Sequence, residues 1–527
     1  MSNYSSKHPV RSSPLLVPIG LIVAYLASQT VAWNWPAASS YFRFQAFVGC
    51  TSLAALLIAV WCLFNRSLST VTKYSGVGIC CLAMLFAMKA TRVDGYLGDA
   101  TPNVTWSWLA SRTASVLTES QPNDVAATHR IDTSISESDS PGFLGVKRDG
   151  TIHGQKLSTD WAHHPPKQLW RRSVGAAWSS FAVAGNVAIT QEQRADSEAT
   201  VCYDLNTGEE RWAHLEPGIK FSESYGGEGP RATPTIHDGF VYSLGATGVL
   251  NCLHGTTGER VWTTNILEDA DADNLGWGMS GSPLVCNGCV VVNPGGKQNR
   301  SVIAYNAFDG EIRWQAGNGQ ASYSSPMQTT IAGVQQIILL NGPALESYEP
   351  STGELLWSYP WIVNDAVMTS IAQPVVVGHD RVFISSGYGK GCALIELTTT
   401  GQHLATREVW SPNRTLKSKL SNVVVRDGFA YGLDEQVLVC LDLATGQRQW
   451  KAGRYGYGQI LRIDDTLLIQ TESGDVVLVR ATPTEHREIT RFSPLSTKTW
   501  TVPVVAKNKL LVRNDREAAC YELSLEE

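Results

Sequence analysis

The sequence predicts an all-β fold, an eight-bladed β-propeller, preceded by an N-terminal region of three transmembrane helices. Two observations predict the propeller: a six-residue phrase that occurs five times, and tryptophans that recur at intervals of about 40 to 53 residues. A third observation predicts the membrane region, because the first hundred residues contain three apolar segments with almost no charge.

The recurring phrase is TGEERW at 207–212, and it returns as TGERVW, DGEIRW, TGELLW and TGQRQW. Glycine accepts positive φ cheaply, so the Thr-Gly pair makes the turn from the third to the fourth strand, and the tryptophan follows four residues later on that fourth strand. We expect this ring to wedge against the adjacent blade, where burying ~150–250 Å² contributes roughly 4–6 kcal/mol as an upper bound. The predicted docking residues are Trp170, Trp212, Trp262, Trp314, Trp357, Trp410 and Trp450, with Gly208, Gly258, Gly310, Gly353 and Gly446.

Each repeat reads as a four-stranded antiparallel meander, as in TPTIHDGFVYSLG (233–245) followed by GVLNCLHGTTGERVW (248–262). A lone meander leaves one face uncovered, whereas a radial arrangement lets each sheet cover its neighbour. We expect Phe492 to take the tryptophan's role in one blade. Because the chain ends on a third strand, AACYELSLEE, and KQLWRR (167–172) is a fourth strand without a blade before it, we expect Trp170 to complete the last blade.

The predicted membrane region covers 15–92, with helices at 15–33, 45–64 and 72–90. A cleaved signal peptide is the alternative for the first segment, but two further apolar segments follow it. Lys7, Arg11, Arg66 and Lys73 place the tail 1–14 and the second loop in the cytoplasm by the positive-inside rule. Three crossings make this a multi-pass protein of the plasma (inner) membrane with the propeller on the periplasmic side; if the third segment does not span, the propeller faces the cytoplasm.

The segment between the two regions, 93–141, is rich in Ser, Asp and Thr and lacks apolar periodicity. It is typical of a flexible polar linker, and the propeller is expected to occupy 142–527. The net charge of −6 offers no basic excess for phosphate contacts, so we expect no nucleic-acid partner.

The patterns CYDLNTGEERW and CLDLATGQRQW resemble the tryptophan-docking repeat of pyrroloquinoline-quinone (PQQ) propellers. Over roughly 142–525 the chain is similar to PQQ-like eight-bladed proteins, both BamB-type propellers and planctomycete membrane-anchored PQQ-like repeat proteins. The resemblance implies the fold, and it leaves two functions open. One is a non-catalytic binding or scaffold domain for protein or cell-envelope partners. The alternative is a PQQ-dependent quinoprotein oxidoreductase, alcohol dehydrogenase-like, with PQQ and calcium at the propeller centre.

Catalytic residues are not evident. The alcohol-oxidising branch of the resembled family carries a vicinal cysteine pair against the cofactor, whereas the adjacent cysteines here, Cys80 and Cys81, lie in a membrane segment. No CxxCH motif for an attached haem is present. We therefore expect no catalytic site, no metal and no cofactor, and the non-enzymatic function is favoured.

The other cysteines and polar motifs have structural interpretations. Ten residues before each marker the repeat has a small residue, so its cysteines are expected to be buried free thiols; the positions are Cys202, Cys252, Ala304, Ser347, Cys440 and, analogously, Cys520. Cys286 and Cys289 flank an Asn-Gly turn as free thiols, with a disulfide or a metal or redox site as alternatives. Ser282, Ser324 and Ser325 are expected to serve turns rather than catalysis, and His163-His164 to lie in a solvated loop rather than at a metal.

If the propeller binds a ligand, the loops that lead into the inner strands converge on the central channel. The candidate binding residues at this channel mouth are Arg231, Trp277, Glu228, Asp365, Lys417 and Lys419, with Glu223, Tyr323 and Tyr457 in the same segments. Mixed charge with aromatic rings suits an anionic, planar or peptide ligand, and Arg231 and Trp277 are the strongest candidates. The alternative is that these are ordinary loop residues that bond to one another.

Overall fold

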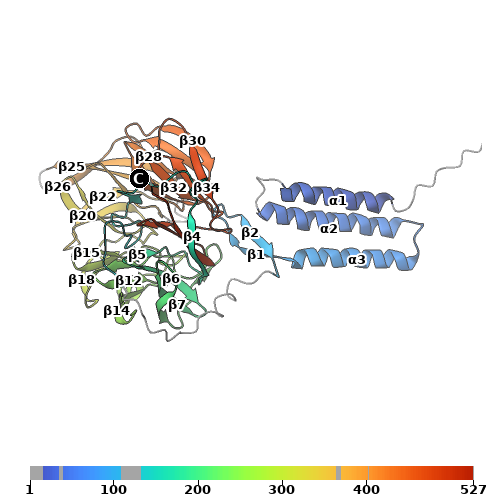
Figure 1. The fold of residues 1–527 in the computed structure, drawn as a ribbon, viewed down its shortest axis with the longest axis horizontal. Coiled ribbons are helices and arrows are strands. Elements are labelled where there is room, and N and C mark those ends of the chain that lie inside the picture. Colours follow the sequence, from blue (N-terminus) through green and yellow to red (C-terminus); the bar gives the residue numbers. More distant parts are fainter. Residues whose placement is uncertain (1–15, 35–39, 109–131, 364–369, 401–402, 526–527) are drawn as a thin grey trace, which may run out of the picture. The chain divides into compact units, whose positions relative to one another are not determined.

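The computed structural model describes residues 16–34, 40–108, 132–363, 370–400 and 403–525. Within it the chain divides into two compact units, residues 1–111 and 112–527 (Figure 1). The described part of the first unit contains three helices and a two-stranded hairpin, and that of the second contains strands and one short helix joined by turns and loops.

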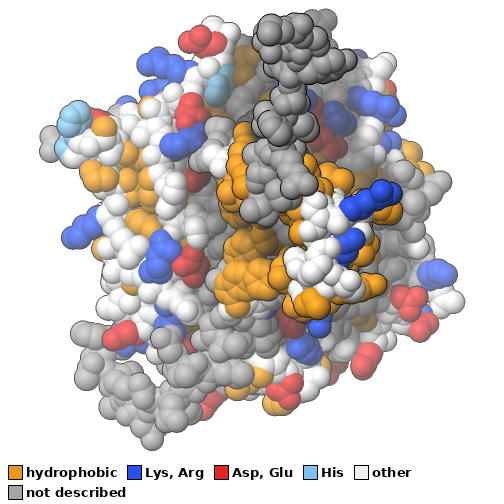
Figure 2. Space-filling model, turned by 90° about the vertical axis from the view of Figure 1, so that its right-hand side faces the viewer, with side chains coloured by type: hydrophobic (Ala, Val, Ile, Leu, Met, Phe, Trp, Pro, Cys, Tyr) orange, Lys and Arg blue, Asp and Glu red, His pale blue; other side chains and the backbone are white. Residues whose placement is uncertain are grey.

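The first unit contains α1 (Leu16–Asn34), α2 (Ser40–Phe64) and α3 (Thr70–Lys89), and α2 packs against both of the others. Two helices, over Arg43–Phe64 and Thr70–Lys89, are long and apolar enough to cross a membrane, and the apolar part of α1, Val17–Trp33, is shorter. Most of the large apolar side chains on all three helices are exposed. Figure 2 shows hydrophobic side chains gathered on these helices, a surface that suits lipid better than water.

The predicted flexible linker, 93–141, is wrong at both of its ends. The strands β1 (Thr91–Tyr96) and β2 (Pro102–Trp106) form an antiparallel hairpin there. At the other end, Ser140 exchanges backbone hydrogen bonds with Val183 of the second unit. Residues 109–131 lie outside the described part of the chain. Polar composition concealed this order because both segments are held by backbone pairing rather than by a periodic apolar face.

In the described part of the chain, the second unit contains eight sheets of four or five strands each. Six of them consist of consecutive strands in sequence order, and the other two combine strands from the two ends of the domain. The strands, sheet by sheet, are β5 (Ala182–Ala184), β6 (Val187–Arg194), β7 (Ser197–Asp204) and β8 (Glu210–Glu216); β11 (Thr235–His237), β12 (Phe240–Leu244), β13 (Val249–His254) and β14 (Arg260–Asn265); β15 (Leu284–Cys286), β16 (Cys289–Val292), β17 (Val302–Asn306) and β18 (Ile312–Ala316); β19 (Met327–Ile331), β20 (Val334–Leu340), β21 (Ala344–Tyr348) and β22 (Leu355–Pro360); β23 (Val375–Val377), β24 (Arg381–Ser386), β25 (Gly391–Thr400) and β26 (His403–Glu408); β27 (Val423–Arg426), β28 (Phe429–Asp434), β29 (Val437–Asp442) and β30 (Arg448–Arg454); β3 (Thr151–Ile152), β31 (Gln459–Ile463), β32 (Thr466–Gln470), β33 (Val476–Arg480) and β34 (Glu488–Phe492); β35 (Val504–Ala506), β36 (Lys509–Arg513), β37 (Glu517–Glu522) and β4 (Lys167–Ser173). A small hairpin, β9 (Ser222–Glu223) with β10 (Gly227–Glu228), and the short helix α4 (Ile266–Ala270) lie in connections between sheets.

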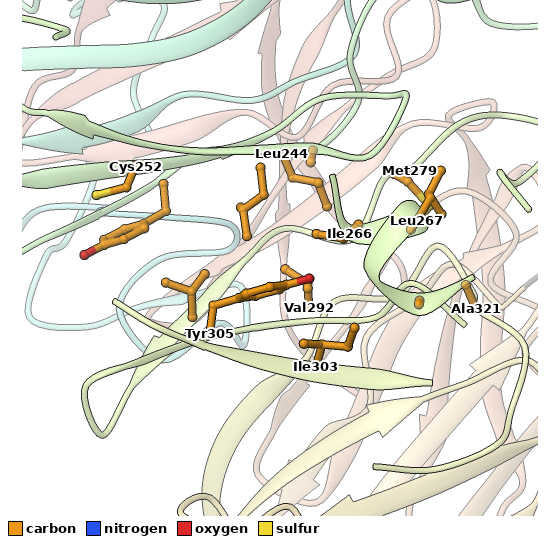
Figure 3. Close-up of a cluster of buried hydrophobic side chains, with 14 of the residues drawn as sticks. Leu244, Cys252, Ile266, Leu267, Met279, Val292, Ile303, Tyr305 and Ala321 are labelled. Carbon is orange, nitrogen blue, oxygen red and sulfur yellow. The ribbon is translucent and has the colours of Figure 1, made fainter. Parts of the chain in front are cut away.

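The hydrophobic core of this unit is divided among the contacts between sheets. Each pair of consecutive sheets shares one cluster of buried side chains, and the first and last sheets share one as well. Figure 3 shows the cluster between the β11–β14 and β15–β18 sheets, where Leu244 and Cys252 face Val292 and Tyr305. The sheets therefore follow one another around a closed circle, as in a propeller.

The predicted pairing of the two ends of the domain is confirmed. Strand β37 pairs with β4 along its whole length, and Trp170 lies opposite Cys520. The small-residue positions have the same place in the other sheets, directly across from the marker tryptophan; for example, Cys202 faces Trp212. These thiols are buried and free, as expected.

The role predicted for Phe492 is wrong. The hairpin shifts register so that Thr490, opposite Leu478, stands where the other sheets place tryptophan, and Phe492 lies two residues further along, opposite Val476. The ring of Phe492 meets Trp161 edge to face at 5.2 Å. Counting residues from the previous marker could not reveal this shift because this sheet lacks the Thr-Gly turn.

The polar residues that begin the inner strands form a belt of hydrogen bonds around the axis. Ser282 accepts from the Thr233 amide and donates its own amide to Ser325, both at 2.9 Å. The belt continues through Gln373 and closes where the Ser180 hydroxyl donates to Val502. Its remaining members are Asn422 and Gln459. The serines Ser282 and Ser325 therefore serve the sheet joints, which agrees with their predicted structural role.

A strap, residues 132–157, runs along the inner strands on the axis side. The Pro141 carbonyl accepts from the amide of Ile236 at 2.7 Å, and Ile152 pairs with Ile463 in the parallel β3–β31 ladder. The buried Arg148 guanidinium donates to the carbonyls of Ser282 and Pro283, both at 2.8 Å, and burial lowers its pKa to about 10. Successive contacts reach different sheets, so the strap ties the ring together from within.

Candidate binding face

The candidate loops meet at one end of the sheets. In an antiparallel four-stranded sheet, the turn between the second and third strands lies at the same end as the connection to the next sheet. We call this end the loop face; the turns that contain Asp238 and the repeated glycines lie at the other end. Residues from several sheets can therefore contact one partner at the loop face.

Arg231 lies at this face, but its side chain is only 8% exposed and braces its own loop. It donates to the Glu223 carboxylate and the Gly227 carbonyl, both at 3.1 Å, and also to the carbonyl of Gly229. Burial lowers the pKa of this guanidinium, and the Glu223 charge opposes that shift. Glu228, another predicted binding residue, pairs with Lys220 at 3.1 Å. Arg231 and Glu228 thus bond to residues of their own loop and stabilise its shape.

Trp277 has a different environment, because its ring is half-buried and joined to other rings. It stacks on Tyr323 with centroids 5.2 Å apart, and the Tyr323 hydroxyl accepts from the Trp277 amide at 3.1 Å. On another side it approaches Tyr388, at 6.4 Å, from the β24–β25 turn of a sheet two places further along the ring. The interaction joins loops from non-adjacent sheets over the channel mouth.

Two lysines continue this arrangement. The Lys419 ammonium lies 4.9 Å from the ring centres of both Tyr388 and Tyr457. The Lys498 ammonium lies 4.2 Å from the ring centre of Trp500 and 5.1 Å from that of Trp178. Glu472 connects the two groups, since it accepts from the Trp500 indole at 2.9 Å and from the amide of Tyr457 at 3.2 Å. The aromatic–cation cluster, as we name it, consists of Trp178, Trp277, Tyr323, Tyr388, Tyr457, Trp500, Lys419 and Lys498.

The remaining predicted candidates do not join the cluster. Lys417 forms an ion pair with the buried carboxylate of Asp434 at 2.5 Å, and Lys451 binds the same carboxylate from the other side. Asp365 lies outside the described residues. The sequence thus predicted four members of the cluster, Trp277, Lys419, Tyr323 and Tyr457. It did not point to Tyr388, Lys498, Trp178 or Trp500, which are single aromatic or basic residues in the connections between strands.

A titratable carboxyl lies beneath the same face. Glu198 is buried in β7 and accepts from the amide of Ala246 in the β12–β13 turn at 3.2 Å. Burial raises its pKa to about 7, and the charge of Arg231 only partly offsets that effect. Its contact links two sheets, so its charge state bears on how they pack.

Three further sets of residues bear on whether the protein could hold a metal or a quinone. Among the described residues, no group of three or more His, Cys, Asp or Glu is arranged to hold a metal ion. The donors of Arg231 are turned to its own loop, and the vicinal pair Cys80–Cys81 lies in α3. Cys286 and Cys289 are free and buried, cross-strand partners at the far end of their sheet; burial raises the pKa of Cys286 to about 12 and that of Cys289 above its usual value.

At that far end, each repeated glycine lies under the tryptophan of the preceding sheet. A methyl group placed on Gly258 would come within 2.5 Å of the Trp212 ring, and one on Gly208 within 2.6 Å of Trp170. The other pairs are Gly310 with Trp262, Gly353 with Trp314, and Gly446 with Trp410. The indole of Trp212 also donates to the Gly255 carbonyl of the receiving turn at 3.0 Å. Glycine is thus needed for two reasons: the backbone has a positive φ, and the indole occupies the space that a side chain would fill.

Two tryptophans depart from this arrangement. The Trp357 indole donates to Gln336 of its own sheet at 2.6 Å, and the next sheet has a long β25–β26 hairpin in place of the repeated turn. Trp450 donates to the carbonyl of Thr482 in the next sheet at 2.9 Å, where the turn carries Pro483 instead of glycine.

The ring of sheets and the glycine–tryptophan contacts define a propeller of repeated tryptophan-bearing units. A family model described as "Outer membrane protein assembly factor BamB" matches residues 195–452. The predicted resemblance to PQQ-like repeat propellers is confirmed, because this chain is similar to BamB proteins and to quinoprotein dehydrogenases.

Named relatives fall into two groups. The outer membrane protein assembly factor BamB of Yersinia pestis is 25% identical over 268 residues, which cover 47% of this chain and 66% of that protein. A quinoprotein ethanol dehydrogenase of Pseudomonas putida is 25% identical over 30% of this chain and 29% of its own length. The crystal structure of BamB from Moraxella catarrhalis aligns with a TM-score of 0.50 at 15% identity, covering 68% of this chain and 99% of that one. The chain thus spans less than two thirds of the length of these curated relatives, and the structural likeness shows the fold alone.

Proposed function

We propose that this protein is a membrane-anchored, non-catalytic binding propeller that presents its loop face to a protein or cell-envelope partner. In this proposal the eight sheets are eight blades stapled by docked tryptophans. The helices α1, α2 and α3 cross the plasma membrane, and the propeller lies on the periplasmic side. The similarity to proteins named as outer membrane assembly factors supports a partner in the envelope.

The aromatic–cation cluster is the observation that carries the proposal. Its rings come from connections of several sheets, and Trp277, Tyr388 and Trp500 remain half-buried rather than covered. Tryptophan and tyrosine at a rigid, partly exposed centre are the residues that dominate binding energy at protein interfaces. The charged groups nearby are engaged with rings or carboxylates, an arrangement that favours recognition over proton transfer.

Site-specific photocrosslinking in the full-length membrane protein tests this function. A photoreactive residue at Trp277 is expected to give a discrete adduct, and the same residue at Asp238, on the opposite end, is expected to give none. A second reporter at Tyr225, in the β9–β10 turn, is also expected to give an adduct, and this adduct should disappear when Lys419→Ala and Trp500→Ala are combined. Equal labelling from Asp238, or no adduct from either loop-face position, would overturn the proposal.

The second candidate is a PQQ-dependent oxidoreductase, which is favoured only by the similarity to quinoprotein ethanol dehydrogenases. Purified full-length protein would be incubated with PQQ and calcium, desalted, and examined for a retained quinone spectrum. Stoichiometric retention together with alcohol-dependent dye reduction would replace the binding function by the enzymatic one. No retention would remove the oxidoreductase from consideration.

A further inference from the structure

Five aromatic rings gather at one end of the helical unit, around Trp106 at the end of β2. Trp33 at the end of α1 stacks on Trp106 with centroids 6.2 Å apart, and Trp108 stacks on it at 4.7 Å. Phe44 and Phe47, from the start of α2, meet Trp106 edge to face at 4.9 and 5.2 Å. The cluster therefore joins the last turn of α1, the first turns of α2 and the hairpin.

The same hairpin is fixed to the end of α3. The Ser107 hydroxyl donates to the Lys89 carbonyl and the Ser107 amide to that of Ala90, both at 2.8 Å. These carbonyls would otherwise be unpaired at the helix end. The hairpin thus sits where three helix ends come together, with its polar turn at Asp99 and Ala100 exposed.

The rings are unevenly covered. Phe44 is buried within the cluster and Trp106 is half-buried, but Trp108 is 60% exposed and Val93 of the facing strand is 56% exposed. Apolar surface continues from them along the helices, where Val31 at the end of α1 is 66% exposed. An exposed indole that borders an apolar helical surface on one side and a polar turn on the other has the two-sided environment of the membrane–water interface.

We infer that the β1–β2 hairpin is an interfacial membrane element, in which Trp106 and Trp108 lie at the lipid headgroup level on the side from which the chain leaves the bilayer. This rests on the membrane anchoring in the proposed function. The length of α3, 20 residues, rises about 30 Å, which matches the hydrocarbon thickness and places its Lys89 end at the opposite interface from Thr70. The partner of this surface is the glycerol and headgroup region of phospholipids.

Depth-dependent quenching in the full-length protein tests the assignment. Wild type and Trp108→Phe would be reconstituted in phosphatidylcholine–phosphatidylglycerol vesicles whose acyl chains carry bromine either near the headgroup or near the chain end. Subtracting the tryptophan fluorescence of Trp108→Phe from that of wild type gives the emission of Trp108. We expect shallow bromine to remove about half of this difference signal or more, because interfacial indoles sit at headgroup level, and deep bromine to leave it nearly intact.

The buried Trp161 of the propeller provides the control, since the wild-type minus Trp161→Phe difference should respond to neither lipid. A Trp108 signal that is insensitive to both bromine positions would mean that water or protein covers the hairpin, and stronger quenching by deep bromine would place it in the hydrocarbon; either result overturns the inference. Flotation with the vesicles separates this failure from failure of the anchor. A chain that floats but shows no shallow quenching contradicts the interfacial hairpin alone, whereas a chain that does not float contradicts the membrane anchoring as well.

Discussion

Two kinds of contact join the sheets of this propeller. In five of the contacts between the described sheets, a tryptophan lies on the repeated glycine of the next sheet. Three contacts lack that glycine. They run from β19–β22 to β23–β26, from β27–β30 to β31–β34, and from β31–β34 to the closing sheet, which consists of β35, β36, β37 and β4. Each of these three has a buried cluster nonetheless. The comparison shows that the repeated phrase is one solution to sheet packing, and that the ring closes without it where other side chains fill the space.

The third of these contacts shows what replaces the indole. Thr490 stands in the tryptophan's register, and Trp161, from the segment before β4, packs against Phe492 and Leu495 in the same cluster. The ring is supplied from a distant part of the chain rather than from the repeat. We therefore expect repeated and irregular contacts to respond differently to mutation.

The largest expected effect is loss of a docked ring. Trp212→Ala removes an indole that is 8% exposed, and we expect it to cost about 3–5 kcal/mol. Phe492→Ala at the irregular contact should cost about 1–2 kcal/mol, because its ring is half-buried and Trp161 remains. Chemical denaturation of the purified protein, followed by near-ultraviolet circular dichroism, measures both. Equal losses would show that the two kinds of contact carry equal weight.

A methyl group on a repeated glycine isolates the indole contact from the turn. Gly258→Ala should cost about 2–4 kcal/mol, because the added carbon meets Trp212 and the residue has φ +72°. Gly288→Ala is the matched control: φ is +71° but nothing lies within 4 Å of the added carbon, so the cost should be only about 1 kcal/mol. If the two variants unfold at the same denaturant concentration, the glycine is required for the turn alone.

The carboxyl that links the β5–β8 and β11–β14 sheets makes the same contact sensitive to pH. Glu198 has its pKa raised to about 7 in the folded state, so folding favours the protonated form. Its stabilising contribution is present below the unfolded pKa near 4.5 and is lost as pH rises through 7. In Glu198→Gln the decline in unfolding free energy between about pH 4.5 and 8 should shrink by roughly 1–3 kcal/mol. An unchanged pH profile in denaturation experiments would assign the decline to other groups.

The smallest effect is expected at the position across from a docked tryptophan. Cys202→Ala should change stability by about 0–1 kcal/mol, because another sheet uses Ala304 in the same place, opposite Trp314. Wild-type Cys202 should also resist alkylation in the native state, since burial raises the pKa of its thiol. If Cys202→Ala lowered stability as much as Trp212→Ala does, the thiol would stabilise the sheet by more than the space it fills.

Features that repeat locally could be predicted from the sequence. The Thr-Gly turns and the strand that carries Trp212 follow from patterns within a dozen residues, and the pairing of Trp170 with the C-terminal strand follows from the incomplete sheet at each end of the domain. The strap could not be predicted, because Ser140 and Pro141 are held by backbone bonds to strands far along the chain. The meeting of Trp277 with Tyr388 was equally hidden, since it depends on two loops that approach over the axis from sheets that are not neighbours.

The closing sheet has a consequence for biosynthesis. Strand β4 is translated before β5 to β36, whereas its partner β37 is translated after them. Until β37 has been translated, the edge of β4 and the indole of Trp170 have no native neighbour on that side, and the nascent domain exposes an unpaired strand for the whole interval. A polypeptide cut short before residue 517 would lose β37 and, with it, the partner of that strand, so quality-control proteases would encounter an open ring rather than a slightly smaller closed one.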